Sequence, residues 1–271
     1  MNRFHQLHRT KLTIQKLLES KFHLGNPYKN VHPLMKSYLS GVVQLRKQDE
    51  YKTRNLYRPI FNLELTLVNI RRALKVVEFI WLQSGTILFV TNRVEYGPII
   101  KKVAKSLDQP YVDGDWVNGL LTNWYGIARH MIEFRKKINT RDSLAVWRRE
   151  KQIKSFNKQY EGLLNMRSLP DLIIFLDGHS CESARREALN LQIPTISLMN
   201  SNMNPEDATY VIPSNDDSVE TVTTFLGLIE ETCKSKEVLE KKLKVQAFQK
   251  MQSEKKPIPK RNRKISRKKK K

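Results

Sequence analysis

The segment Asp177-Gly-His179-Ser180 contains an acid, a base and a hydroxyl, the side-chain types of nucleophilic catalysis. It follows the apolar run 169–177, so we expect it at the carboxyl end of a strand, where active sites of open α/β sheets lie. Residues this close in sequence rarely form a triad, and the chain has no Gly-x-Ser-x-Gly nucleophile turn. We therefore predict no catalytic residue and no enzyme activity.

The sequence also has to be searched for motifs that bind a nucleotide or a metal ion. In TILFVTNRVEYG, the turn after a predicted strand contains neither GxGxxG nor GxxxxGK[ST], so the backbone cannot approach a pyrophosphate closely. Arg93 stands at this turn, and we predict that it contacts nucleic-acid phosphate, with a solvated loop arginine as the alternative. His23 and His32 have no third ligand nearby, and Cys181 and Cys233 lack CxxC spacing. We predict no cofactor, no metal and no small-molecule substrate.

The charge of the chain is the strongest compositional signal. Its 271 residues include 49 Lys and Arg against 27 Asp and Glu, a net charge of +22. The charge is polarised, because residues 1–61 carry +9 and 254–271 carry +10, whereas 166–233 carry −8. Such a protein favours a polyanionic partner. Apolar runs such as 172–176 are far too short to cross a bilayer, so no membrane partner is expected.

Hydrophobic periodicity places these residues on alternating helices and strands. Apolar residues at steps of three and four predict a helix from Leu63 to Gly85, and continuous apolar runs with β-branched residues predict strands. The predicted strands are 86–91, 111–112, 169–177, 193–199 and 210–213, and the further helices are 99–107, 182–191 and 218–233. We expect Asp216, Asp217 and Ser218 to cap the last helix. This order predicts an α/β fold, Rossmann-like or flavodoxin-like, with helices on both faces of a parallel sheet.

The segment 124–165 interrupts this alternation. Apolar residues continue at helical spacing from Ile127 to Ile138 and again from Val146 to Leu163. Their period is close to 3.5 and the segment carries +6, so we predict an inserted antiparallel coiled-coil hairpin, with two ordinary packed helices as the alternative. The expected organisation is a basic extension at 1–16, an α/β domain at 17–123 and 166–233, the hairpin at 124–165, and a basic tail at 234–271 that begins helical and ends disordered.

The loop WVNGLLTNW joins the domain to this predicted hairpin. We expect Trp116 and Trp124 to wedge the loop against the sheet and the base of the hairpin. Gly119 permits a turn, and Thr122 or Asn123 caps the outgoing helix. Whether an Asn of the loop also contacts RNA is left open by the sequence.

Four segments, in order, resemble the bacterial-type small-subunit ribosomal protein S2 family. They are LLESKFHLGNPYKNVHPLMKSYL, GTILFVTNR, WVNGLLTNW, and LPDLIIFLD followed by EALNLQIPTISLMNSNMNPEDATYVIPSNDDSV. The resemblance runs from about Leu17 to Glu230. It implies an α/β domain with a coiled-coil arm, and a non-catalytic place in the small ribosomal subunit, bound to rRNA near the junction of head and body and next to other ribosomal proteins.

The chain departs from the family pattern at four positions. Asn26 stands where a second His is usual, Asn118 replaces a loop Gly, and Asn200 and Asn204 stand where acids are common. An ion site of relatives is therefore not expected here.

Basic side chains of the N-terminal segment, the arm and the tail are predicted to neutralise rRNA phosphates, with little base readout. The predicted RNA-binding residues are Lys29, Lys36, Arg93, Asn118, Asn123, Arg129, Arg135, Lys136, Lys137, Arg148, Arg149, Lys260, Arg261 and Arg263. The alternatives are a nucleotide-dependent enzyme on a Rossmann-like scaffold and a nuclear protein with a basic tail. The basic start and tail favour a mitochondrial ribosome, with a plastid or the bacterial cytoplasm as alternative locations.

Overall fold

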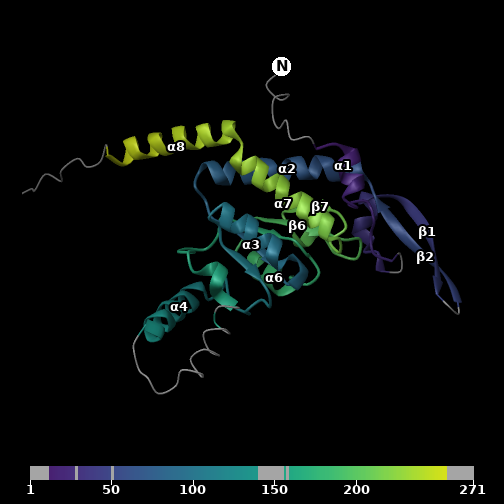
Figure 1. The fold of residues 1–271 in the computed structure, drawn as a ribbon, viewed down its shortest axis with the longest axis horizontal. Helices are drawn as coiled ribbons and strands as arrows, with labels where there is room; N and C mark the ends of the chain where they lie inside the picture. The colour runs from purple at the N-terminus through teal and green to yellow at the C-terminus, as the bar shows by residue number, and fades with distance from the viewer. Residues whose placement is uncertain (1–11, 28–29, 50–51, 140–155, 157–158, 255–271) are drawn as a thin grey trace, which may run out of the picture.

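The computed structural model describes residues 12–27, 30–49, 52–139, 156 and 159–254. At its centre is a five-stranded parallel sheet in the order β4-β3-β5-β6-β7 (Figure 1). The strands are β3 (Ile87–Thr91), β4 (Tyr111–Asp113), β5 (Leu172–Phe175), β6 (Thr195–Met199) and β7 (Tyr210–Pro213). Counted along the chain, this is the flavodoxin-like order 2-1-3-4-5, so the predicted α/β fold with a parallel sheet is confirmed.

Helices cover both faces of the sheet, because alternate strand residues point in opposite directions. Ile87 and Phe89 pack with α1, α2, α3 and α7, whereas Leu88 and Val90 pack with α4, α6 and the loop before α4. The helices are α1 (Ile14–Glu19), α2 (Leu63–Leu82), α3 (Gly97–Ser106), α4 (Trp124–Asn139), α6 (Glu182–Asn190), α7 (Val219–Lys234) and α8 (Lys236–Glu254). Short 3-10 turns occupy 33–38, 94–96, 161–163 and 205–207.

The predicted arm is described only in its first half. Helix α4 begins at Trp124, as the apolar spacing indicated, and runs to Asn139. The second helix of the predicted coiled-coil hairpin lies largely at 140–158, outside the described residues except for Phe156. Phe156 is buried in the cluster that contains Leu88 and Val90. The coiled coil stays a prediction.

Helix α8 follows α7, and its first half packs against the C-terminal end of α2. The Lys242 ammonium lies 3.4 Å from the centre of the Trp81 ring, and Lys241 pairs with Glu78 at 3.1 Å. Residues 236–254 are therefore helical, with the first half of the helix attached to the domain, while the rest of the tail, 255–271, lies outside the described residues.

A two-stranded antiparallel ribbon stands apart from the sheet, and the sequence pattern did not indicate it. Strand β1 (Leu39–Asp49) pairs with β2 (Lys52–Phe61), and the ribbon projects from the domain beside the start of α2 (Figure 1). Charged residues and Pro59 interrupt the apolar alternation that marks a strand, so the segment has no clear period.

Candidate functional site

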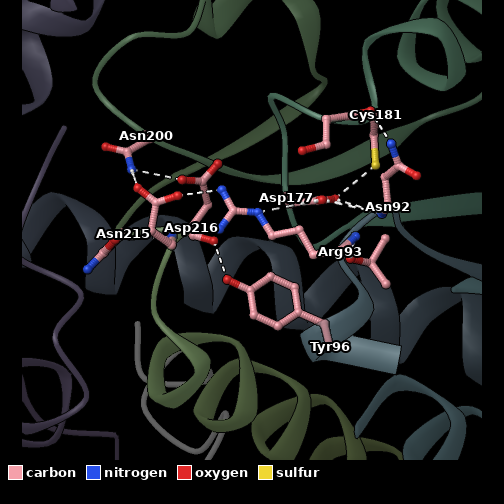
Figure 2. Close-up of polar contacts among 11 residues, drawn as sticks. Asn92, Arg93, Tyr96, Asp177, Cys181, Asn200, Asn215 and Asp216 are labelled. Atoms are coloured by element: carbon pink, nitrogen blue, oxygen red, sulfur yellow. Dashed lines mark hydrogen bonds and ion pairs between the residues drawn. The ribbon is translucent and has the colours of Figure 1, made fainter. Parts of the chain in front are cut away.

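Polar side chains from four strands meet at the carboxyl edge of the sheet. Asn92 and Arg93 follow β3, Asp177 follows β5, Asn200 follows β6 and Asp216 follows β7 (Figure 2). The strand order reverses between β3 and β5, so the cluster lies at the point where α/β folds of this type bind ligands. The geometry of each member decides whether the cluster is a ligand site or part of the fold.

Asp177 is fully buried and satisfied by its neighbours. Its carboxylate accepts hydrogen bonds from the Asn92 backbone N–H at 3.3 and 3.4 Å and from the Cys181 thiol at 2.9 Å. Burial raises the pKa of Asp177, and these hydrogen bonds oppose the increase. His179 is exposed, whereas the Ser180 hydroxyl bonds to Asp177. The acid, base and hydroxyl of this segment therefore do not form a charge-relay arrangement.

Arg93 lies at the middle of the cluster, half-buried. Its guanidinium forms an ion pair with Asp217, lies 3.9 Å from a carboxylate oxygen of Asp177, and stands over the ring of Tyr96 at 5.7 Å. The Tyr96 hydroxyl in turn donates to the backbone carbonyl of Asp216 at 2.6 Å. The charge of Arg93 is thus matched within the protein, and the contact to RNA phosphate expected of it remains a prediction.

Asn200 connects three parts of the chain through its side-chain amide. The Nδ2 group donates to a carboxylate oxygen of Asp216 at 2.8 Å, and Oδ1 accepts from the backbone N–H of Asn26 at 2.9 Å and of Ser201 at 2.8 Å. A carboxylate at this position could accept but not donate. The network therefore requires an amide at position 200, because this side chain both donates and accepts.

Asp216 has one satisfied and one unsatisfied carboxylate oxygen. The side chain is 1% exposed, and Oδ2 is buried without a hydrogen-bond partner among the described residues. Burial, together with the negative charge of Asp217, raises the pKa of Asp216 to about 7, although the hydrogen bond from Asn200 opposes the increase. No group of three or more His, Cys, Asp or Glu side chains that could hold a metal ion occurs within the described part of the chain.

The expected capping of α7 by 216–218 is confirmed only in part: Ser218 is the N-cap residue, whereas Asp216 and Asp217 precede the helix. Asp216 is turned into the cluster and Asp217 toward Arg93, while the Ser218 hydroxyl donates to Glu220 at 2.6 Å and makes no side-chain cap bond. Glu220 is the acid in the first turn. Long-range pairing with β3 and β6 residues outweighs the local preference of an acid for a helix N-terminus, which contributes only about 0.3–1 kcal/mol.

The loop 116–124 is held by a single carboxylate from α6. Glu187 accepts four hydrogen bonds, two on each oxygen. The donors are the indole Nε1 of Trp116 at 2.9 Å and the backbone N–H groups of Gly119 at 2.7 Å, Leu121 at 2.9 Å and Thr122 at 3.3 Å. Burial by itself would raise the pKa of Glu187, but the four hydrogen bonds to its carboxylate have the larger combined effect and lower the pKa. The sequence showed this residue only as one acid on an amphipathic helix.

The remaining loop residues orient the start of α4. Gly119 has φ +86°, a left-handed conformation that favours glycine. Trp124 is 1% exposed and packs in the cluster with Leu88, Val90 and Met131, which fixes the base of the helix against the sheet. Asn118 and Asn123 are exposed on the outer side of the loop.

The predicted RNA-binding residues are distributed over three parts of the chain. Lys36, Asn118, Asn123 and Arg129 are exposed. For Arg135, Lys136 and Lys137 the structure describes the backbone of α4 but not the side chains. Lys29, Arg148, Arg149, Lys260, Arg261 and Arg263 lie outside the described residues. The structure therefore places the loop and the α4 positions next to one another, and leaves the rest unplaced.

Fold and site together define a basic α/β protein whose sheet edge is filled by its own hydrogen-bonded side chains and whose α4 helix is anchored through a carboxylate-held loop. The family model described as ribosomal protein S2 matches residues 17–236. The chain therefore belongs to the ribosomal protein S2 family. No helix within the described residues is long and apolar enough to span a membrane.

Several curated relatives carry the name small ribosomal subunit protein uS2. The protein of Anaplasma marginale is 30% identical over 229 residues, which are 82% of this chain and 67% of the relative. The protein of Ehrlichia canis is 30% identical over 229 residues, 82% of this chain and 75% of the relative. That of Aeromonas salmonicida is 29% identical over 231 residues, 82% of this chain and 90% of the relative.

Proposed function

We propose that this protein is a structural component of a small ribosomal subunit, where it binds the rRNA and neighbouring ribosomal proteins. The observation that carries the proposal is the family match across 17–236, which includes the sheet, the carboxylate-held loop and helix α4. The net charge of +22 supports it, because rRNA is the polyanion that such a surface fits. The relatives named above are small-subunit proteins by name.

The mechanism that we propose is binding without catalysis. Exposed cations such as Lys36 and Arg129 neutralise rRNA phosphates and release counterions, which supplies affinity that falls with salt. The Glu187-held loop fixes the direction in which α4 leaves the domain, so the basic positions of the helix are presented in one orientation. Position within the subunit then comes from the shape of the domain and its arm, as is usual for folded RNA.

We further propose that the ribosome is mitochondrial. The segment 1–16 is basic and has no acid, which suits import into an organelle, and the tail 254–271 adds a charge of +10. A bacterial or plastid ribosome is the alternative that the experiment below separates.

Gradient sedimentation of the tagged protein from cells lysed at moderate salt tests both proposals. We expect the protein in the small-subunit fraction, together with mitochondrial small-subunit rRNA identified by sequencing. Co-sedimentation with plastid or cytoplasmic rRNA would keep the ribosomal function and overturn the compartment. A protein that stays at the top of the gradient without RNA would overturn the function and return attention to the enzyme alternative.

A further inference from the structure

The β1–β2 ribbon is attached to the domain at its base. Phe61 is buried with Met35, Met199 and Met203, and its backbone N–H donates to the His23 carbonyl at 2.9 Å. Next to it, the Gly25 N–H donates to the Pro59 carbonyl at 2.9 Å. These contacts connect the root of the ribbon to the loop that Asn200 holds.

Away from this base, the ribbon leaves the domain. Val42 is 46% exposed and Tyr57 is 51% exposed, and no third strand pairs with β1 or β2 beyond Ile60 in the part of the chain that the structure describes. Pairing continues through ten positions to Asp49 opposite Lys52, which corresponds to about 30 Å at the usual rise per strand residue. A lone two-stranded ribbon is at best marginally stable in water, so its length points to a partner that covers it.

The charge of the ribbon indicates what that partner is. Residues 39–61 contain five basic residues, Arg46, Lys47, Lys52, Arg54 and Arg58, and two acids, Asp49 and Glu50. The register places Lys47 directly opposite Arg54 and leaves Arg46 opposite the neutral Asn55. Like charges at directly paired positions destabilise a sheet on their own, and an anion between them reverses the sign of that interaction.

The root of the ribbon adds one group suited to nucleic acid. Tyr57 presents an exposed aromatic ring, which can stack on an unpaired base. An acidic protein surface would match the cations, but it would use the exposed Tyr57 ring less directly than a phosphate backbone with unstacked bases.

We propose that the β1–β2 ribbon is a second RNA-binding arm, which lies between phosphate backbones of folded RNA. The register puts Lys47 and Arg54 on one face of the ribbon and Arg46 on the other, together with Tyr57, which we propose lies against a base at the root of the ribbon. The inference rests on the proposed function, because the RNA meant is that of the small subunit. It adds a surface that neither the predicted hairpin at 124–165 nor the tail provides. The contacts are mainly electrostatic, so the ribbon positions the protein and does not read sequence.

The first test neutralises the ribbon in the full-length protein. The triple variant Arg46→Gln, Lys47→Gln, Arg54→Gln is compared with the unmodified protein for binding to deproteinised small-subunit rRNA from the same cells, over a series of salt concentrations. We expect binding about 10- to 100-fold weaker near 0.15 M salt and a salt slope smaller by about 2 to 3, as three lost phosphate contacts predict.

The matched control removes the same charge elsewhere. Arg71, Arg72 and Lys75 are exposed on α2, so their replacement by Gln changes the net charge equally without touching the ribbon. This control should bind within about twofold of the unmodified protein if the contacts are local. Thermal unfolding of both variants verifies that each is folded.

A shortened ribbon provides an independent variant. Deleting Arg46, Lys47, Arg54 and Asn55 removes two adjacent cross-strand pairs, and with them the same three cations. Because two pairs are removed, residues beyond the deletion keep their original face of the ribbon. We expect the same loss of affinity as for the neutralised variant.

The outcomes separate the two levels of the proposal. Selective loss in the ribbon variants supports the arm. Equal loss in the α2 control, or no loss in the ribbon variants while the protein still sediments with small subunits, overturns the arm and leaves the proposed function standing. If the ribbon variants bind rRNA normally but a neighbouring protein is lost from the subunit, the ribbon is assigned to a protein contact instead. An unmodified protein that neither binds rRNA nor sediments with subunits overturns the proposed function itself.

Discussion

Two carboxylates organise two regions of this protein, and their surroundings shift their pKa values in opposite directions. Glu187 holds the loop 116–124 with four donors on two oxygens, and its pKa is lowered although burial acts against this. Asp216 holds the carboxyl edge of the sheet with one donor from Asn200, and its pKa is raised to about 7 because burial leaves Oδ2 unpaired. Burial raises the pKa of each carboxyl group and hydrogen-bond donors lower it, so the number of donors decides the direction of the shift.

The comparison shows how one fold builds two kinds of anchor. At the loop, the negative charge is needed, because backbone N–H groups without an acceptor would otherwise be left unpaired. At the sheet edge, the amide of Asn200 and the guanidinium of Arg93 balance carboxylates that would otherwise repel one another. The site that resembles a ligand cleft by position is therefore an internal polar network that joins the N-terminal loop to the sheet.

The largest effect is expected when the sheet-edge network loses its donor. Asn200→Asp removes the hydrogen bond to Asp216 and adds a buried charge beside Asp216 and Asp217. The free energy of unfolding should fall by about 3 kcal/mol at pH 7.5, since an unpaired buried charge is costly. Urea denaturation measures it, and much of the loss should be recovered at pH 5.5, where a protonated carboxyl can again donate.

Asn204→Asp is the matched control for this substitution. The Asn204 side chain accepts from the Glu206 backbone N–H at 3.1 Å, a bond that a carboxylate also makes. Its Nδ2 donates at 3.4 Å to Asp207, whose side chain is 43% exposed, so the donor lost here is screened by solvent, unlike the buried one at position 200. Its effect should stay below about 1 kcal/mol. Equal destabilisation by the two variants would show that the donor at position 200 is not what matters.

The loop anchor is tested by Glu187→Gln. The amide keeps one acceptor oxygen but presents an NH₂ group to backbone donors, so two N–H groups lose their partner. We expect a loss of about 2 kcal/mol in the free energy of unfolding, measured by urea denaturation, and weaker rRNA binding because α4 is no longer held in one direction. Glu182→Gln on the same helix, whose pair with Arg186 is exposed, should change stability by less than about 0.5 kcal/mol.

The opposite pKa shifts predict opposite pH dependences. Because the folded-state pKa of Asp216 is raised from 3.8 to about 7, the folded protein holds a proton that the unfolded chain has released, and stability falls as pH rises through this window. The lowered pKa of Glu187 has the reverse effect: its contribution is present above 4.5 and is lost as pH falls below that value. Asp216→Asn should therefore stabilise the protein at pH 7.5 by about 1–2 kcal/mol and flatten its stability between pH 5 and 7. An unchanged profile in thermal unfolding across this range would contradict the assignment.

The smallest effect concerns the backbone of the loop. Gly119→Ala should cost about 1 kcal/mol, because φ +86° is unfavourable for alanine although the nearest atoms are 3.9 Å from the added carbon. Gly114→Ala, two residues before the same loop and facing open space, should be neutral. Thermal unfolding distinguishes the two, and equal Tm values would show that the loop relaxes around the new side chain.

Several features of the molecule could be predicted from sequence because they depend on local pattern. The run at 86–91 forms β3, and the stripe that starts at Leu63 forms α2, although the helix ends at Leu82, three residues before the predicted Gly85. Capping was less predictable. Residues 216–218 have side chains that favour a helix start, but Asp216 bonds to Asn200 and Asp217 pairs with Arg93 instead. Local preferences of a fraction of a kcal/mol are easily overridden by such contacts.

The sequence by itself determined the α/β order, the basic character and the family resemblance, because periodicity, composition and motif order are all local along the chain. Only the tertiary structure decided that Glu187 holds the 116–124 loop, which lies more than sixty residues away, and that Asn200 joins Asn26 to Asp216. It also revealed the ribbon at 39–61, whose strands are specified by their pairing with each other and not by a hydrophobic period. Hydrogen bonds between distant residues depend on chain geometry, and no local pattern records them.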